Sequence, residues 1–181
     1  MTKALLIVDI QNDYFPGGRM ELVGSDAAAS NAAALLAEFR REGQQVFNIQ
    51  HVSKSPTASF FLPGTHGVEI HSSVAPAAGD TVVVKHFPNS FRETGLLELL
   101  RSVDVTELIA VGMMTHMCID TTVRAANDHG FKVTLVADAC ATRDLEYNGA
   151  TVAAADVQTS YLAAIDGSFA TVISTAEALA L

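Results

Sequence analysis

The chain has 181 residues, of which 49% are hydrophobic and 17% are charged, and its formal net charge is −9. This length is typical of one domain, predicted here over residues 1–181, and the composition excludes a disordered chain. The acidic balance excludes a nucleic-acid partner, because the 11 Lys and Arg form no basic stripe. No apolar run is long enough to cross a bilayer and no cleavable signal is visible. We therefore expect a cytoplasmic protein without a membrane partner.

Apolar runs and helical periodicity alternate along the chain, and turn-forming residues separate them. In chain order, the predicted elements are a strand at 4–8, a helix at 25–43, a strand at 45–50, a loop at 52–80, a strand at 81–85, a helix at 96–100, a strand at 108–112, a helix at 115–130, a strand at 131–137, a helix at 151–164, a strand at 169–173 and a terminal helical turn. This alternation predicts an α/β fold with three α/β/α layers. A six-stranded, mainly parallel sheet would carry helices on both faces, in a Rossmann-like topology.

Three of the predicted strands lead into a chemically useful side chain. Asp9 follows the first strand, Lys85 ends the third, and Cys118 comes shortly after the fourth. Because the carboxyl ends of parallel strands meet at one edge of the sheet, we expect an acid, an amine and a thiol to converge there. His51 also ends a strand, but it is interpreted as a loop or supporting histidine.

Cys118 is the candidate nucleophile. Thr115 is predicted to cap a helix, which would place Cys118 in the first turn, where the helix stabilises a thiolate. Lys85 would add positive charge, and Asp9 could take the thiol proton and later return it to a leaving group. Cys140 follows an apolar strand, and we predict that it is a buried, unreactive residue.

Four segments, in this order, are similar to the motifs of one known family. They are LLIVDIQNDYFPGG at 5–18, VKHFPNSF at 84–91, GMMTHMC at 112–118 and VADACAT at 136–142. On these motifs the chain resembles the isochorismatase-like cysteine hydrolase superfamily, which includes nicotinamidases, carbamoylsarcosine and ureidoacrylate amidohydrolases, and isochorismatases. The similarity spans nearly the whole chain.

The resemblance implies a catalytic triad of Asp9, Lys85 and Cys118. It also implies a non-proline cis peptide between Met113 and Met114, and an oxyanion hole formed by the N–H groups of Met114 and Cys118. In that arrangement Thr115 would not cap the Cys118 N–H.

Departures from individual members narrow the chemistry. In nicotinamidases, the family resemblance implies an Asp-x-His motif after the second strand and a further metal-binding His. This chain has no acid beside His51 at that place. His51, His66 and His71 have spacings that match no metal motif, so neither a metal nor a cofactor is predicted. Isochorismatases that cleave a vinyl ether typically lack the cysteine. The sequence therefore favours hydrolysis of a C–N bond in a small amide, lactam or carbamoyl compound through a thioester.

The predicted substrate contacts are Gln11, Phe15, Phe91 and His116. The partner is a small-molecule substrate, and family resemblance implies a homo-oligomer, either a dimer or a tetramer. Two alternatives remain open. One is a vinyl-ether or ester hydrolase that uses the same pocket, and the other is a non-catalytic relative that binds a small molecule or senses redox state through a Cys118 thiol of low pKa.

Overall fold

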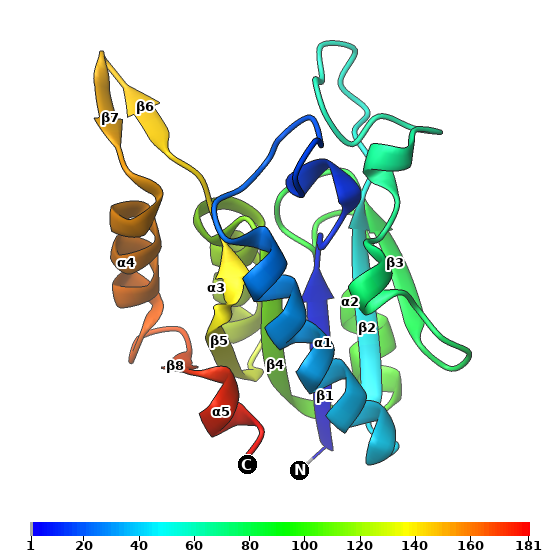
Figure 1. Cartoon of the computed structure of the whole chain (residues 1–181). Helices are drawn as coiled ribbons and strands as arrows, with labels where there is room; N and C mark the ends of the chain where they lie inside the picture. The colour runs from blue at the N-terminus through cyan, green and yellow to red at the C-terminus, as the bar shows by residue number, and fades with distance from the viewer. Residues whose placement is uncertain (1) are drawn as a thin grey trace.

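The computed structural model describes residues 2–181, in which six strands form one sheet and every neighbouring pair is parallel (Figure 1). In chain order the strands are β1 Thr2–Val8, β2 Gln45–His51, β3 Thr81–Lys85, β4 Val105–Met113, β5 Lys132–Ala141 and β8 Thr171–Ile173. Their order in the sheet is β3-β2-β1-β4-β5-β8. The predicted α/β class with a parallel sheet is confirmed.

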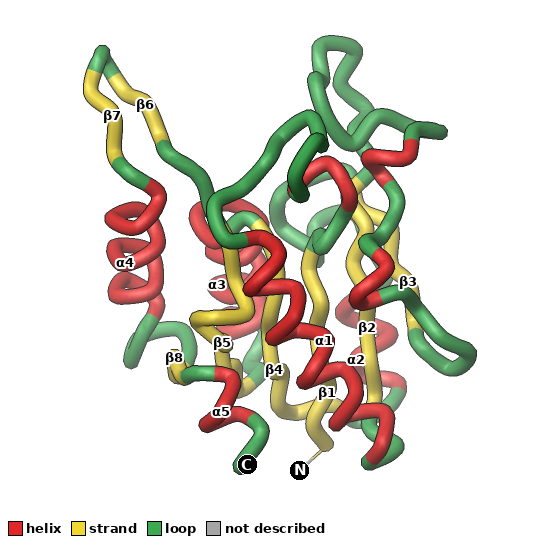
Figure 2. Tube along the Cα trace, in the orientation of Figure 1, coloured by secondary structure: helices red, strands yellow, loops and turns green. Residues whose placement is uncertain are grey.

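Helices cover both faces of this sheet (Figure 2). One face packs against α1 Ser25–Arg41 and the short α5 Thr175–Ala178, and the other packs against α2 Leu96–Ser102 and α3 Asp120–Asp128. At the side, α4 Ala154–Ile165 packs against α3 and β8. Within residues 2–181, no helix is both long enough and apolar enough to span a membrane.

The central strand β1 explains why its run of residues is apolar without interruption. Leu5 and Ile7 pack in the cluster under α1, whereas Ala4, Leu6 and Val8 pack in the cluster under α2 and α3. Both faces of the strand are therefore buried, which removes the polar alternation of a half-exposed strand.

The strand order reverses next to β1. From β1 the chain adds β2 and β3 on one side, and then crosses back to add β4, β5 and β8 on the other. Such a switch point opens a crevice at the carboxyl ends of the two central strands. Asp9 directly follows β1, and the segment carrying Cys118 directly follows β4.

Two parts of the structure differ from the predicted elements. A two-stranded antiparallel hairpin, β6 Leu145–Tyr147 and β7 Ala150–Val152, was not predicted, and it projects from the body before α4 (Figure 1). In addition, β5 continues to Ala141, with a register shift against β4 between Ala110 and Gly112. Cys140 therefore lies inside a strand. Asp138, which the sequence pattern placed at the end of the strand, lies instead within β5, at this register shift.

Candidate active site

A buried ion pair lies at the switch point. Lys85 Nζ is 2.8 Å from Asp9 Oδ2, and both side chains are fully buried. The same ammonium donates a hydrogen bond to the Pro88 carbonyl at 2.7 Å. Burial opposes the charge on Lys85, but the adjacent Asp9 carboxylate outweighs burial and raises the pKa of this ammonium. Lys85 is therefore positively charged in the site at neutral pH.

Cys118 adjoins this pair. Its side chain is 3% exposed, and potential ligand atoms of Asp9, His51 and Cys118 all lie within 4.8 Å of one another. Burial and the nearby Asp9 carboxylate raise the pKa of the thiol, and they outweigh the lowering effect of Lys85. The expectation of a resting thiolate is therefore wrong. The ion pair is already neutral as a whole, so a thiolate would add an uncompensated buried negative charge.

The turn that carries Cys118 is not the first turn of an α-helix. Thr115–Ile119 forms a single π-helical turn, and α3 begins only at Asp120. The Met113–Met114 peptide bond is cis. The predicted cap is wrong, because the Thr115 hydroxyl donates to the Ala141 carbonyl of β5 at 3.2 Å and accepts no backbone N–H at the helix start.

Gly112 permits the close approach of β1 and β4 next to Asp9. It pairs with Val8, has a φ of 135°, and a Cβ atom added there would overlap the Val8 carbonyl. The sequence offers only the glycine itself as a signal for this contact.

We expect Gly112→Ala to lower the free energy of unfolding by more than about 2 kcal/mol, because it adds an overlap with backbone to an unfavourable φ. The matched control is Gly24→Ala, whose φ is 77° and whose added Cβ would meet open space. It should cost about 1–2 kcal/mol from its φ alone. Urea unfolding of both variants measures the difference, and equal costs would contradict a tight contact between the strands.

His51 is the residue of this site that sequence reasoning missed. It is the last residue of β2 and pairs in register with Lys85 of β3. Its Nδ1 lies 4.0 Å from Cys118 Sγ and 3.8 Å from Asp9 Oδ2. The signal was present in the sequence, because His51 ends an apolar strand at the same edge as Lys85.

The three histidines considered for a metal site do not share a site. His66 is exposed beside Glu69, and His71 stacks on Phe15. Within residues 2–181, the group whose atoms lie close enough to hold a metal is instead Asp9, His51 and Cys118. The Lys85 ammonium already occupies the Asp9 carboxylate and repels a cation, so this donor set fits acid–base chemistry better.

Gln11 does not offer its amide to a substrate. The side chain is fully buried, its Oε1 accepts the His51 N–H at 2.7 Å, and its Nε2 donates to the His51 carbonyl at 2.9 Å. Nε2 also donates to the Val68 carbonyl at 2.7 Å. The predicted substrate contact is therefore corrected: Gln11 holds the backbone of His51.

The other three predicted substrate contacts are also engaged elsewhere. Phe15 stacks on His71 with ring centroids 3.7 Å apart. Phe91 packs against His129 and Phe131, beyond the far end of α3. His116 bonds Thr142 Oγ1 through Nδ1 at 2.6 Å, and burial lowers the pKa of its imidazole. These contacts give Phe15, Phe91 and His116 packing roles between loops and helices, and their contact with a substrate stays a prediction.

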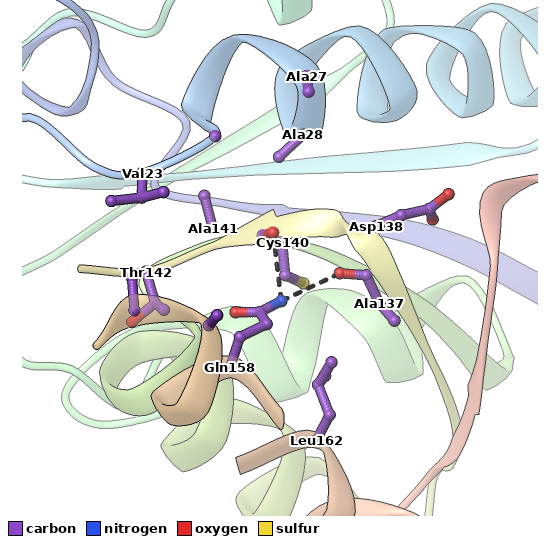
Figure 3. A pocket seen from close by; sticks show the side chains of 13 residues that line it. Val23, Ala27, Ala28, Ala137, Asp138, Cys140, Ala141, Thr142, Gln158 and Leu162 are labelled. Atoms are coloured by element: carbon purple, nitrogen blue, oxygen red, sulfur yellow. Dashed lines mark hydrogen bonds between the residues drawn. The ribbon is translucent and has the colours of Figure 1, made fainter. Parts of the chain in front are cut away.

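A cavity of about 400 Å³ lies away from the triad, between the start of α1, the end of β5 and α4 (Figure 3). Alanine is the commonest residue in its wall, and the Gln158 amide donates to the carbonyls of Ala137 and Cys140 at 3.2 and 3.4 Å. Cys140 lies in this wall, and burial raises the pKa of its thiol to about 12. The prediction that Cys140 is buried is confirmed, and its high pKa makes it a poor nucleophile.

Comparisons with known proteins agree with this architecture. A family model described as "Isochorismatase domain" matches residues 3–177. YddQ of Bacillus subtilis, an uncharacterized isochorismatase family protein, is 51% identical over 97% of both chains. A solved structure from Oleispira antarctica, described as an isochorismatase hydrolase, is 47% identical and superimposes with a TM-score of 0.96 over 99% of this chain and 97% of its own. Nicotinamidase 3 of Arabidopsis thaliana is 32% identical over 82% of this chain and 78% of its own.

Proposed function

Since this chain belongs to the isochorismatase family of hydrolases, we propose that it cleaves a C–N bond of a small amide, lactam or carbamoyl compound through a thioester on Cys118. One observation carries the proposal. A thiol, a carboxylate and an ammonium meet at the sheet switch point, and the carboxylate and the ammonium are already paired at 2.8 Å. Similarity to a nicotinamidase supports an amide as the substrate class.

The first half of the reaction forms the thioester. Asp9 takes the proton of the Cys118 thiol as the sulfur attacks the carbonyl carbon, and Lys85 stabilises the charge that develops on the sulfur. Asp9 is suited to this step because its Oδ1 has no hydrogen-bond partner within residues 2–181. The N–H groups of Met114 and Cys118 are the proposed donors to the carbonyl oxygen. The C–N bond then breaks, and the proton on Asp9 passes to the leaving nitrogen.

The second half of the reaction releases the acid. A water molecule attacks the thioester carbonyl and gives its proton to Asp9, and the C–S bond breaks. The sulfur takes that proton back, which restores the thiol and the Asp9–Lys85 pair. The resting thiol that the structure indicates is therefore the state in which each cycle begins and ends.

The direct test is a panel of small substrates with matched ester controls. The purified protein is incubated with nicotinamide, a simple primary amide, a five-membered lactam, an N-carbamoyl amino acid and an ester, and the released ammonia, amine or acid is measured. To detect the acyl group, the reaction is stopped in acid and the mass of the Cys118 peptide is measured by mass spectrometry. Turnover of a nitrogen compound with acylation of Cys118 supports the proposal. Turnover of the ester alone, or no acylation with any substrate, would overturn it.

The pKa of Cys118 predicts how its alkylation depends on pH. Its iodoacetamide rate should reach half of its maximum above pH 8.5, roughly the pKa of a free thiol, because burial and Asp9 disfavour the thiolate. Asp9→Asn removes a negative charge and should move this midpoint to lower pH. Lys85→Met removes a positive charge and should move it to higher pH. Peptide mass spectrometry follows Cys118 separately from Cys140, and a wild-type midpoint below 8.5 would contradict the resting thiol.

The redox-sensing alternative fits the site less well. Oxidation sensors need an accessible thiol of low pKa, whereas Cys118 is 3% exposed and its pKa is raised. The acid–base arrangement around the sulfur therefore favours hydrolysis.

A further inference from the structure

We infer that His51 is a fourth catalytic residue, which donates a hydrogen bond from Nδ1 to the Cys118 sulfur when that sulfur becomes negatively charged. This rests on the proposed function, because the sulfur becomes charged when it acts as the nucleophile. The geometry points to the sulfur, because His51 Nδ1 lies 4.0 Å from Cys118 Sγ, which is within hydrogen-bonding distance of a sulfur atom. The same nitrogen lies 3.8 Å from Asp9 Oδ2, which is too far for a hydrogen bond to oxygen. Among residues 2–181, no other side chain bonds this nitrogen.

The position of His51 is held by an otherwise unexplained buried amide. Gln11 uses both ends of its side chain on the His51 backbone, at 2.7 and 2.9 Å, in a fully buried setting. Register pairing with Lys85 adds the β3 side of the support, and the Phe61 ring lies 5.8 Å from the imidazole. The imidazole is only 16% exposed. This is an ordered residue inside the site, and a freely moving surface histidine would need none of this support.

The charged sulfur needs a second donor. The titratable side chains around it are Asp9, Lys85, Tyr14 and His51. Once Asp9 has taken the thiol proton it carries no charge, and burial raises the pKa of Tyr14, which keeps its phenol neutral. Among the described residues, 2–181, Lys85 is the one cation beside the sulfur, and it also contacts Asp9 and the Pro88 carbonyl. A buried anion served by one shared cation is poorly solvated, and an N–H at the position of His51 Nδ1 supplies the missing donor.

The destination of the Cys118 thiol proton distinguishes a hydrogen-bond donor from a general base at His51. As a donor, His51 keeps its Nδ1 proton throughout, while the thiol proton moves to Asp9. As a base, His51 would itself take the thiol proton. Asparagine distinguishes the two roles, because its side-chain amide can donate near the position of Nδ1 but cannot accept a proton at neutral pH.

The experiment compares His51→Asn with His51→Leu, which has nearly the same shape and no donor. His51→Leu should lower kcat by about 10- to 100-fold with little change in KM, as expected for a lost hydrogen bond to a charged group. It should also move the midpoint of Cys118 alkylation to higher pH. His51→Asn should stay within about threefold of the wild type in both measurements. His66→Leu, at an exposed loop position, is the matched histidine control and should change neither.

Three results would overturn the inference. Equal losses in His51→Asn and His51→Leu would make His51 the base, and an unchanged alkylation midpoint in His51→Leu would remove its contact with the charged sulfur. A loss confined to KM would assign it to substrate binding. His51→Ala, checked by circular dichroism, replaces the leucine variant if that variant does not fold. Because alkylation needs no substrate, a shifted midpoint without any amide turnover would reject the proposed function and leave the role of His51 at the sulfur standing.

Discussion

Cys118→Ala should abolish amide hydrolysis, lowering kcat/KM by roughly 10⁴-fold or more, because no other group in the site can form the covalent intermediate. The wild-type sulfur lies beside both Asp9, the proposed acceptor of its proton, and the Lys85 ammonium. Alanine removes the nucleophile while leaving the Asp9–Lys85 pair intact. The measurement is steady-state kinetics on whichever panel compound the wild type turns over fastest.

The matched control for this prediction is Cys140→Ala. Cys140 is also buried and is the second of the two cysteines, but it lies in the wall of a separate cavity (Figure 3). The kcat/KM of Cys140→Ala should stay within about twofold of the wild type, since an inert thiol contributes packing alone. Residual activity above a tenth of the wild type in Cys118→Ala would show that the chemistry does not pass through this sulfur.

Lys85→Met should be the most destabilising single change in the site. It leaves the Asp9 carboxylate fully buried without its cation, and removing one partner of a buried pair costs about 3–5 kcal/mol. Changing Asp9 to Asn as well removes the stranded charge, so the double variant should recover part of the loss. An exposed pair provides the control: Arg41→Met, which breaks the contact with Glu38, should cost far less than Lys85→Met, because solvent screens this pair.

The pH dependence of this stability gives a second check. Because the pKa of Lys85 is raised on folding, its contribution is fully present below its unfolded pKa of about 10.4 and is lost as pH rises through the folded value. The gap in unfolding free energy between wild type and Lys85→Met should therefore narrow above pH 10.4. Urea unfolding between pH 7 and pH 11 measures it. A gap that is small at pH 7, or that widens with pH, would contradict a stabilising buried pair.

Sequence patterns predicted the layers of this fold because its central strands, β1 and β4, are buried on both faces. The continuous apolar runs, such as residues 4–8, have no other stable place in a chain of this size. The β6–β7 hairpin escaped prediction because its strands have three residues each and lie off the core, so little apolar periodicity marks them. Because residues 151 and 152 belong to this hairpin, α4 begins at Ala154 and not at 151, where the helix was predicted to begin.

Single side chains were predicted well where a strand end determines their location. Asp9 and Lys85 could be placed at one edge because strand direction alone decides that question. The substrate contacts could not, since Gln11, Phe15 and Phe91 lie in loops whose path depends on distant partners. Gln11, for example, bonds residues 40 and 57 positions away along the chain.

By itself, then, the sequence determined the parallel sheet, the family resemblance and the meeting of an acid, an amine and a thiol, because these follow from local apolar runs and from motifs. Tertiary structure decided the direction in which the Cys118 pKa shifts and the position of His51 beside the sulfur. Burial, the Asp9 carboxylate after β1 and the Lys85 ammonium on β3 set the pKa of the thiol, whereas the pairing of β2 with β1 and β3 places His51. Neither arrangement exists until those strands pack together. The helix start and the lysine predicted from the sequence would favour a thiolate. In the folded chain, burial and the Asp9 carboxylate raise the pKa of the thiol and keep it neutral.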